Sequence, residues 1–173
     1  MVEVKERLAA CKLEMHPEKS KIVYCKDSNR QEMHPFIEFD FLGFTFRPRE
    51  AMNKRNQKFT SFLPGVSRKA VIKMRQTMRG WHLPKQTPAT LEELAVRYGP
   101  VLGGWWNYYG SFYKTEMRKV FQGLDCLLAH WARRKYKKLQ RHKRRSMHWL
   151  GRVALRQPGL FIHWQVLGKP AAG

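Results

Sequence analysis

Acidic residues are scarce in this chain. Its 173 residues include 13 Asp and Glu against 34 Lys and Arg, which gives a formal net charge of +21. A compact chain with this imbalance repels itself, and an anionic partner relieves the repulsion. Nucleic acid is therefore the first partner that the composition indicates, and an anionic membrane surface is the second. Solubility alone is a weaker explanation, because added positive charge is a poor way to gain it.

Cysteines and long apolar runs are also few. Cys11, Cys25 and Cys126 lie far apart, and none belongs to a C-x-x-C pair. This spacing disfavours a disulfide framework and a structural zinc site, and it fits a reduced, cytoplasmic setting. The sequence has no apolar run of about 18 residues, so we expect no transmembrane helix and no membrane partner.

Carboxylates that could hold a catalytic metal are rarer still, since aspartate occurs only at Asp27, Asp40 and Asp125. A polymerase or nuclease that uses two metal ions needs clustered carboxylates for Mg²⁺. Only Glu38 and Asp40 would share a strand face, and an exposed strand explains that pair more simply. The common glycine-rich motifs that cradle nucleotide phosphates are absent as well. We therefore expect no catalytic residue, no metal site and no cofactor in this chain.

The first 64 residues alternate short apolar segments with turn-forming residues, a pattern typical of β-structure. A short helix over residues 2–12 precedes these segments, and Gly43 permits a bulge within one of them. Strands are expected at 22–25, 36–46 and 58–63, with a polar loop over 47–56.

The remainder of the chain has apolar residues at helical spacing. Ser67 is expected to cap a helix that carries basic residues around one apolar face. Thr90 and Glu93 form a capping box for the next helix, which Gly99–Pro100 is expected to break. The clearest apolar stripe runs from Met117 to Trp131. The predicted fold class is therefore α+β, with a small β part followed by a mainly helical part.

A dense basic strip follows this stripe. Nine of the thirteen residues from Arg133 to Arg145 are Lys or Arg. On a continuing helix these charges would cover every face and repel one another, so phosphate contact is favoured over a merely solvated surface. Ser146, directly after the strip, is expected to cap the last helix.

An aromatic cluster between glycines precedes the stripe. Trp105 and Tyr109 are expected in the core, whereas base stacking and core packing are equally favoured for Trp106, Tyr108 and Tyr113. The candidate RNA-binding residues are Lys69, Lys73, Arg75 and Arg79 of the first basic helix, Trp106 and Tyr108, and the strip residues Arg133, Arg134, Lys135, Lys137, Lys138, Arg141, Lys143, Arg144 and Arg145.

Four segments resemble, in order and spacing, the C-terminal half of group II intron-encoded reverse transcriptase/maturases. The resemblance covers nearly the whole chain. It implies the end of a polymerase palm over 1–64, a thumb helix and linker over 65–89, a maturase-specific domain over 90–165 and a tail over 166–173. The segments are Leu13-x-x-x-Pro17-Glu-Lys-Ser-Lys21, Phe39-Asp-Phe-Leu-Gly-Phe44, Gly104-Trp-Trp-Asn-Tyr-Tyr109 and Trp131-Ala-Arg-Arg-Lys-Tyr136.

The resemblance implies a module that binds group II intron RNA and assists its splicing. The parent family also performs RNA-directed DNA synthesis. By resemblance, Lys19 corresponds to a palm lysine that assists nucleotide addition, and Phe41, Leu42 and Gly43 lie in the primer-grip region. The family's Tyr-x-Asp-Asp metal site occurs nowhere in the sequence. Polymerase activity is therefore not expected of this chain alone, and Mg²⁺ is expected only for a complete polymerase site.

Two alternatives stay open. The chain could serve as a thumb and primer-grip subunit that completes a split reverse transcriptase in trans. Its partners would then be a separate fingers/palm chain and DNA or an RNA–DNA primer-template. The other alternative is a nonfunctional fragment of a mobile element.

Overall fold

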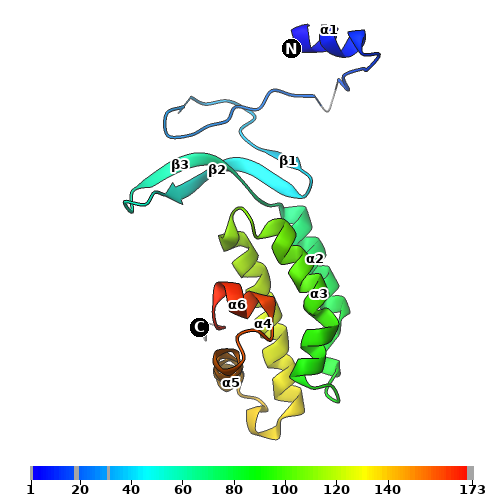
Figure 1. Cartoon of the computed structure of the whole chain (residues 1–173), viewed down its shortest axis with the longest axis vertical. Coiled ribbons are helices and arrows are strands. Elements are labelled where there is room, and N and C mark those ends of the chain that lie inside the picture. Colours follow the sequence, from blue (N-terminus) through cyan, green and yellow to red (C-terminus); the bar gives the residue numbers. More distant parts are fainter. Residues whose placement is uncertain (1, 18–19, 31, 171–173) are drawn as a thin grey trace. The chain divides into compact units, whose positions relative to one another are not determined.

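The computed structural model describes residues 2–17, 20–30 and 32–170 of the chain, which forms two compact units (Figure 1). One unit comprises residues 1–39 and 47–62, and the other comprises residues 40–46 and 63–173. Helices and one small sheet together fit the predicted α+β class. Lys19, the predicted palm lysine, lies outside the described residues.

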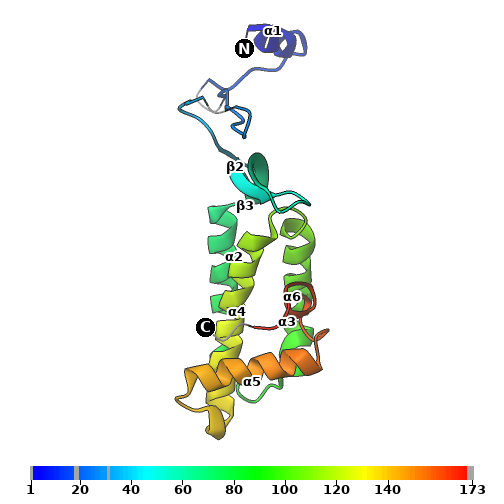
Figure 2. The same ribbon diagram turned by 90° about the vertical axis from the view of Figure 1, so that its left-hand side faces the viewer.

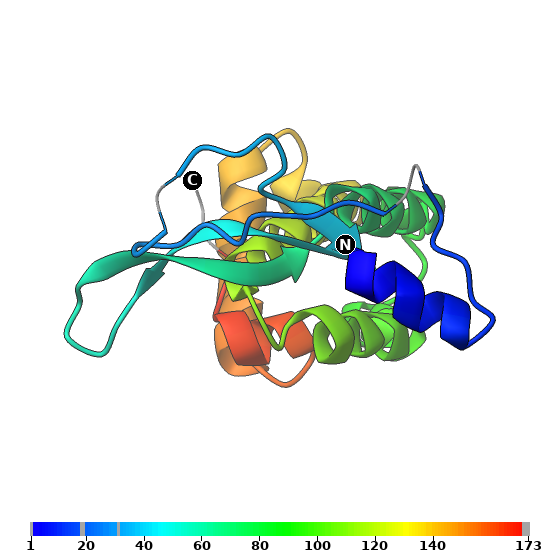
Figure 3. The ribbon, with the colours of Figure 1, turned by 90° about the horizontal axis from the view of Figure 1, so that it is seen from above.

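The sheet has three antiparallel strands in the order β1-β2-β3. Figure 3 shows β2 and β3 running side by side to the turn that joins them. The helix expected near the N-terminus is present as α1 (Val2–Ala10). The strands are β1 (Phe39–Phe41), β2 (Phe44–Met52) and β3 (Lys58–Val66).

The strand predicted at 22–25 is wrong. This segment is neither strand nor helix, although the Tyr24 amide donates to the Phe36 carbonyl at 2.8 Å. β-branched and aromatic residues favour a strand only where a neighbouring strand supplies a ladder of hydrogen bonds. Within the described part of the chain, the sheet consists of β1, β2 and β3 and includes no residue of this segment.

The loop predicted over 47–56 is also wrong in its first half, because β2 continues through Pro48 to Met52. β1 has three residues and joins β2 through the two-residue turn Leu42–Gly43, so β1 pairs only with the start of β2. Pro48 lies beyond that pairing, where a missing amide hydrogen is tolerated as it is at a sheet edge. β3 likewise runs through Pro64 to Val66 instead of ending at Leu63, and β3 is an edge strand.

The second unit is built around α4, which contacts every other helical element described in it. Figures 1 and 2 show α2, α3 and α4 side by side, with α5 crossing one end of α4. The elements are α2 (Arg68–Gly80), η1 (Leu83–Lys85), α3 (Leu91–Tyr109), α4 (Lys114–Lys135), η2 (Lys137–Leu139), α5 (Lys143–Arg156) and α6 (Ile162–Leu167).

Both predicted N-caps of the first two long helices are confirmed. The Ser67 hydroxyl accepts from the Ala70 amide at 3.2 Å and starts α2. Thr90 and Glu93 exchange the two hydrogen bonds of a capping box at the start of α3. These bonds satisfy amide hydrogens that have no partner inside the helix.

The break predicted at Gly99–Pro100 is wrong, since α3 continues from Leu91 to Tyr109. An internal proline removes one helical hydrogen bond and crowds the carbonyl four residues earlier. That carbonyl belongs to Val96, whose side chain is exposed. Val96 and Pro100 both lie on the exposed side of α3, where water can replace the missing hydrogen bond, and this lowers the cost of keeping Pro100 inside the helix.

The apolar stripe predicted from Met117 to Trp131 is confirmed as the buried face of α4. Asp125 lies on the same face and is buried. Its carboxylate accepts from the Trp164 indole at 2.9 Å and pairs with the His163 imidazole at 2.9 Å. The His163 ring also stacks on Phe121, with ring centroids 5.0 Å apart. Asp125 is thus a structural carboxylate that fastens α6 to α4.

Leu124 tests how far the second unit depends on this face. Its side chain is 1% exposed in the centre of α4. We expect Leu124→Ala to lower the free energy of unfolding by about 2–5 kcal/mol, because it removes apolar contacts and leaves a cavity. Denaturant titration followed by helical circular dichroism measures the change. Leu155→Ala is the control, since Leu155 is 64% exposed on α5 and should change stability by less than about 0.5 kcal/mol. Equal effects of the two changes would contradict the assignment of the core.

Candidate nucleic-acid interface

The basic strip does not form one continuing helix. α4 ends at Lys135, and Tyr136 has an extended backbone with φ −107° and ψ 115°. Buried Trp131 donates its indole hydrogen to the Gln86 carbonyl at 2.9 Å. This bond fixes the end of α4 against the segment between η1 and α3. The chain then turns through η2 into α5, and we call residues 135–142 the corner.

Lys135 has a structural position at this corner. Its ammonium group donates to the carbonyls of Thr87, Pro88 and Ala89 at 3.0, 3.2 and 2.7 Å. It also lies 5.5 Å from the ring centroid of Trp131. An ammonium group has three hydrogens to donate. All three are directed at the protein, although the side chain was predicted to contact RNA.

Arg133 is engaged in a similar way. Its guanidinium donates to the Ser146 hydroxyl at 2.8 Å, and that hydroxyl donates to the Lys143 carbonyl at 2.7 Å. Ser146 therefore lies inside the first turns of α5 and does not cap it, so the predicted cap is wrong. α5 begins at Lys143 after His142, which makes no side-chain capping bond. Arg133 instead ties the start of α5 to α4.

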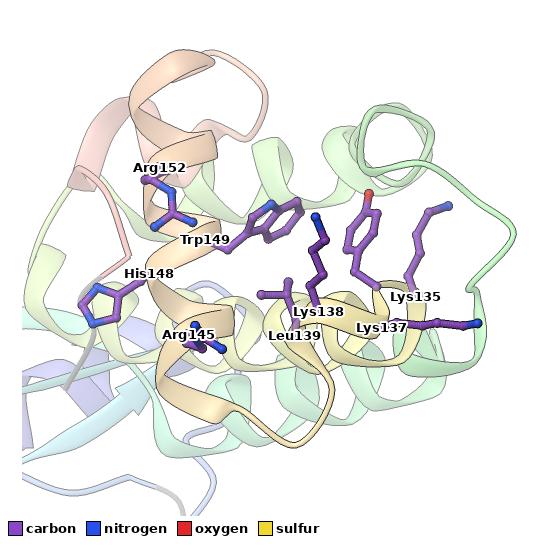
Figure 4. Close-up of a pocket in the computed structure, with 9 residues that line it drawn as sticks. Lys135, Lys137, Lys138, Leu139, Arg145, His148, Trp149 and Arg152 are labelled. Atoms are coloured by element: carbon purple, nitrogen blue, oxygen red, sulfur yellow. The ribbon is translucent and has the colours of Figure 1, made fainter.

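The corner and α5 enclose a hollow of about 1010 Å³, which we call the basic hollow. Figure 4 shows its residues arranged along two segments, the corner and α5, with Trp149 directed toward the corner and His148 toward the other side of the helix. Five of the nine lining residues are Lys or Arg, and none is Asp or Glu. The lining residues are Lys135, Tyr136, Lys137, Lys138, Leu139, Arg145, His148, Trp149 and Arg152.

Aromatic rings form one side of the basic hollow. The ring centroids of Tyr136 and Trp149 are 5.2 Å apart with their planes at 52°. Both rings rest on Trp131, at 5.9 Å for Tyr136 and 6.5 Å for Trp149. Trp131 is fully buried, Trp149 is half-buried and Tyr136 is 37% exposed. The exposed ring surfaces of Tyr136 and Trp149 are thus held in place by packing on the core residue Trp131.

The electrostatics of this region are strongly positive. Lys137, Lys138, Arg145 and Arg152 are exposed, and none has an ion pair with another described residue. Burial, together with the charge of Glu92, raises the pKa of Tyr136, so its hydroxyl keeps its proton at neutral pH. Clustered positive charges attract anions over a distance set by the Debye length, which is roughly 8–10 Å near physiological salt.

His130, just before the strip, adds little to this charge. Its own burial and the guanidinium groups of Arg133 and Arg134 lower the pKa of His130. A histidine whose pKa falls below its ordinary value is neutral at neutral pH. The positive field of the region therefore comes from lysine and arginine.

A second, smaller depression of about 300 Å³ lies at the turn between β1 and β2, and we call it the turn depression. It brings the predicted primer-grip residues Phe41, Leu42 and Gly43 beside Lys69 and Lys73 of α2. Its lining residues are Asp40, Phe41, Leu42, Gly43, Ser67, Lys69, Ala70, Lys73 and Tyr109.

The turn itself has an unusual backbone. Leu42 and Gly43 have φ of 47° and 81°, the positive values required in the two-residue turns of β-hairpins. Leucine rarely adopts a positive φ. The Leu42 side chain is 67% exposed, so its burial does not hold the turn in place. The Tyr108 hydroxyl donates to the Leu42 carbonyl at 2.9 Å, and a Cβ atom at Gly43 would lie 2.7 Å from the Tyr109 hydroxyl. The turn is therefore held by α3 and requires glycine at position 43.

The aromatic cluster mostly supports the fold. Trp105 stacks on Trp81 with centroids 5.9 Å apart, and Tyr109 packs on Phe44 at 5.3 Å. Both lie half-buried against the core, which confirms their predicted place. Trp106 also packs there, at 6.3 Å from Phe121.

The predicted RNA-binding residues are not all brought together. Lys69 and Lys73 line the turn depression, and Arg75 and Arg79 are exposed elsewhere on α2. Four strip residues enter the basic hollow: Lys135, Lys137, Lys138 and Arg145. Arg134, Arg141, Lys143 and Arg144 are exposed outside it.

Sequence reasoning missed five of the residues that line the basic hollow, namely Tyr136, Leu139, His148, Trp149 and Arg152. A signal was available on the last helix, since Arg145, Trp149 and Arg152 follow one another at helical spacings of four and three. No comparable signal marks Tyr136, because its position depends on where α4 ends.

Each of the three aspartates interacts with another residue of the protein and not with a second aspartate. Asp27 pairs with Arg30, whose hydrogen bond lowers the pKa of that carboxyl, and Asp40 accepts from the Thr45 hydroxyl. Asp125 is buried with α6, as described above. Within residues 2–17, 20–30 and 32–170, no group of three His, Cys, Asp or Glu could hold a metal ion. The same residues include no helix long and apolar enough to cross a membrane.

Comparison with known families gives one match. Residues 71–149 match the family model described as group II intron, maturase-specific domain. The match begins inside α2 and ends at Trp149 in α5, so it includes the corner and most of the basic hollow. It supports the predicted relation to the C-terminal region of group II intron maturases. No curated protein and no solved structure matches the chain.

Lys135 and Lys137 provide a matched test of the two kinds of basic residue in the strip. We expect Lys135→Met to lower the free energy of unfolding by about 1.5–3 kcal/mol, because three carbonyls lose a charged donor. Lys137→Met should change it by less than about 0.5 kcal/mol, since Lys137 is exposed. Denaturant titration of both variants measures the difference. If both variants are as stable as the wild type, the structural role of Lys135 is wrong.

Proposed function

We propose that this chain is an RNA-binding module of the maturase type, which binds group II intron RNA and assists its splicing. It acts by neutralising phosphates with lysine and arginine and by bracing RNA with aromatic rings. The observation that carries the proposal is the basic hollow, which lies largely inside the matched maturase-specific region.

The chemistry of the basic hollow supports RNA over other anions. Lys137, Lys138, Arg145 and Arg152 are exposed cations that suit a phosphate backbone. Aromatic rings beside such cations add a surface on which unpaired bases can stack. An inorganic anion would use the charges but not the rings. An RNA with exposed bases uses both.

The basic hollow can be tested by removing its free charges. We expect wild-type binding to a group II intron transcript to weaken steeply with salt, as for roughly 6–10 phosphate contacts. Replacing Lys137, Lys138, Arg145 and Arg152 by Gln should reduce the slope of log K against log salt concentration by roughly 3, since each lost contact removes about 0.7–0.9. Filter binding across a salt series measures this slope.

A matched control removes the same number of charges from the other unit. Lys5, Arg7, Lys54 and Arg55 are exposed there, and their replacement by Gln lowers the net charge equally. This control should keep the wild-type slope. If both variants change the slope equally, binding depends on net charge, and the basic hollow is not the interface.

A second candidate function is that of a thumb and primer-grip subunit, which completes a polymerase with a separate fingers/palm chain. The turn depression favours it, because exposed Phe41 and Leu42 lie beside Lys69 and Lys73 at a surface where a primer strand could lie.

Primer extension distinguishes the two functions. The purified chain alone should give no product on an RNA template, because it has no Tyr-x-Asp-Asp site. Product that appears only when a fingers/palm chain is added, and that is lost with Lys69→Gln and Lys73→Gln, would favour the second candidate. Product from the chain alone would contradict both.

A further inference from the structure

We infer that the basic hollow takes one unpaired nucleotide of a folded RNA, with its base on the rings of Tyr136 and Trp149. This inference rests on the proposed RNA-binding function and specifies which RNA feature the hollow recognises. The ring surface at the corner is supported by the core. Tyr136 is 37% exposed although it packs on Trp131 and Trp149, so its free surface is held in place before any ligand arrives. A rigid ring loses little freedom when a base stacks on it.

Positive side chains from two segments lie around the rings. Lys137 and Lys138 come from the corner, and Arg145 and Arg152 come from α5, so cations flank the rings on both segments (Figure 4). A nucleotide bound on the rings continues into phosphates on both sides. The two segments supply cations for each direction of the backbone.

The size of the basic hollow and the need for an exposed base face both favour an unpaired nucleotide. Its volume of about 1010 Å³ lies at the upper end of the roughly 300–1,000 Å³ typical of pockets for small organic molecules. A base paired within a duplex exposes only its edges in the grooves and shows no ring face to a protein. Inside a stem, only a base that has left the stack can place its face on Tyr136. Bulges and loops of folded RNA provide such bases.

The Tyr136 hydroxyl adds a hydrogen-bond donor beside the ring surface. Among the described residues, none forms a hydrogen bond with the Tyr136 hydroxyl, and the raised pKa of this group keeps it a donor at neutral pH. The hydroxyl lies in the plane of its own ring, so it can donate to the ribose or the phosphate of a nucleotide whose base is stacked on that ring.

The test uses two RNA hairpins that differ at one position, each closed by a polyethylene glycol linker in place of a nucleotide loop so that the loop offers no unpaired base. In one, a single 2-aminopurine is bulged from the stem, and in the other the same residue is paired. The wild-type chain should bind the bulged hairpin roughly tenfold more tightly, as expected of one stacked base. The fluorescence of the bulged analogue should fall on binding, because stacking on an aromatic ring quenches it. The fluorescence of the paired analogue should stay constant.

Variants assign the effect to Tyr136. Tyr136→Leu keeps apolar bulk but removes the ring, so it should lose the preference for the bulged hairpin while it still binds both RNAs. Tyr136→Phe should keep the preference. Phe59→Leu is the control, because Phe59 is 40% exposed in the other unit and should have no effect. A folded Tyr136→Leu chain that keeps the full preference would overturn the inference.

Other outcomes separate this inference from the proposed function. If the wild type binds both hairpins equally, without a change in fluorescence, the inference is wrong and RNA binding by phosphate contact stands. If it binds neither hairpin at low salt, the proposed function fails as well. If polyglutamate of equal charge displaces the bulged hairpin as well as unlabelled RNA does, the hollow is a general anion site and the inference is wrong.

Discussion

The end of α4 is the constraint on which the second unit depends. Trp131 and Lys135 direct their hydrogen-bond donors at the carbonyls of residues 86–89, the segment that leads into α3. These bonds fix the last turn of α4 in place, and the backbone leaves the helix at Tyr136, which has φ −107° and ψ 115°. The chain therefore turns at Tyr136, and α5 is brought back across α4. This turn places two runs of basic residues opposite each other, where a straight helix would have spread them around one axis.

Local patterns in the sequence were sufficient for most of this unit. Ser67 and Thr90 start their helices as expected, because a capping side chain bonds within three residues of itself. The stripe on α4 was predictable because helical periodicity and burial coincide there. The predictions failed where distant contacts decide. Pro100 is tolerated inside α3 because Val96 faces solvent. The segment 47–52 is a strand because β3 pairs with it.

At the candidate site, the charge could be predicted from composition, whereas the arrangement of the residues depends on distant contacts. Positive charge between Arg133 and Arg145 was evident from the sequence, and four basic residues of that strip line the basic hollow. The sequence could not show that Lys135 and Arg133 are bound within the protein, because their partners lie 46–48 and 13 positions away. It also could not show the ring surface, which exists only once Tyr136 has left the helix and met Trp149. Charge is a property of composition, whereas a stacking surface is a property of the corner.

The partners of the structural cations explain how so basic a chain can fold and still keep free cations for the RNA that we propose it binds. The cations with structural roles, Lys135 and Arg133, are bound to carbonyl and hydroxyl oxygens, which accept a hydrogen bond without adding a negative charge. Carboxylates in these places would have neutralised the positive field around the basic hollow. With neutral acceptors, the field remains and the frame is still rigid. The exposed cations then repel one another until an anion lies between them. In the function that we propose, part of the free energy of RNA binding comes from relief of that repulsion, and the preformed rings select an RNA with an unpaired base over other anions.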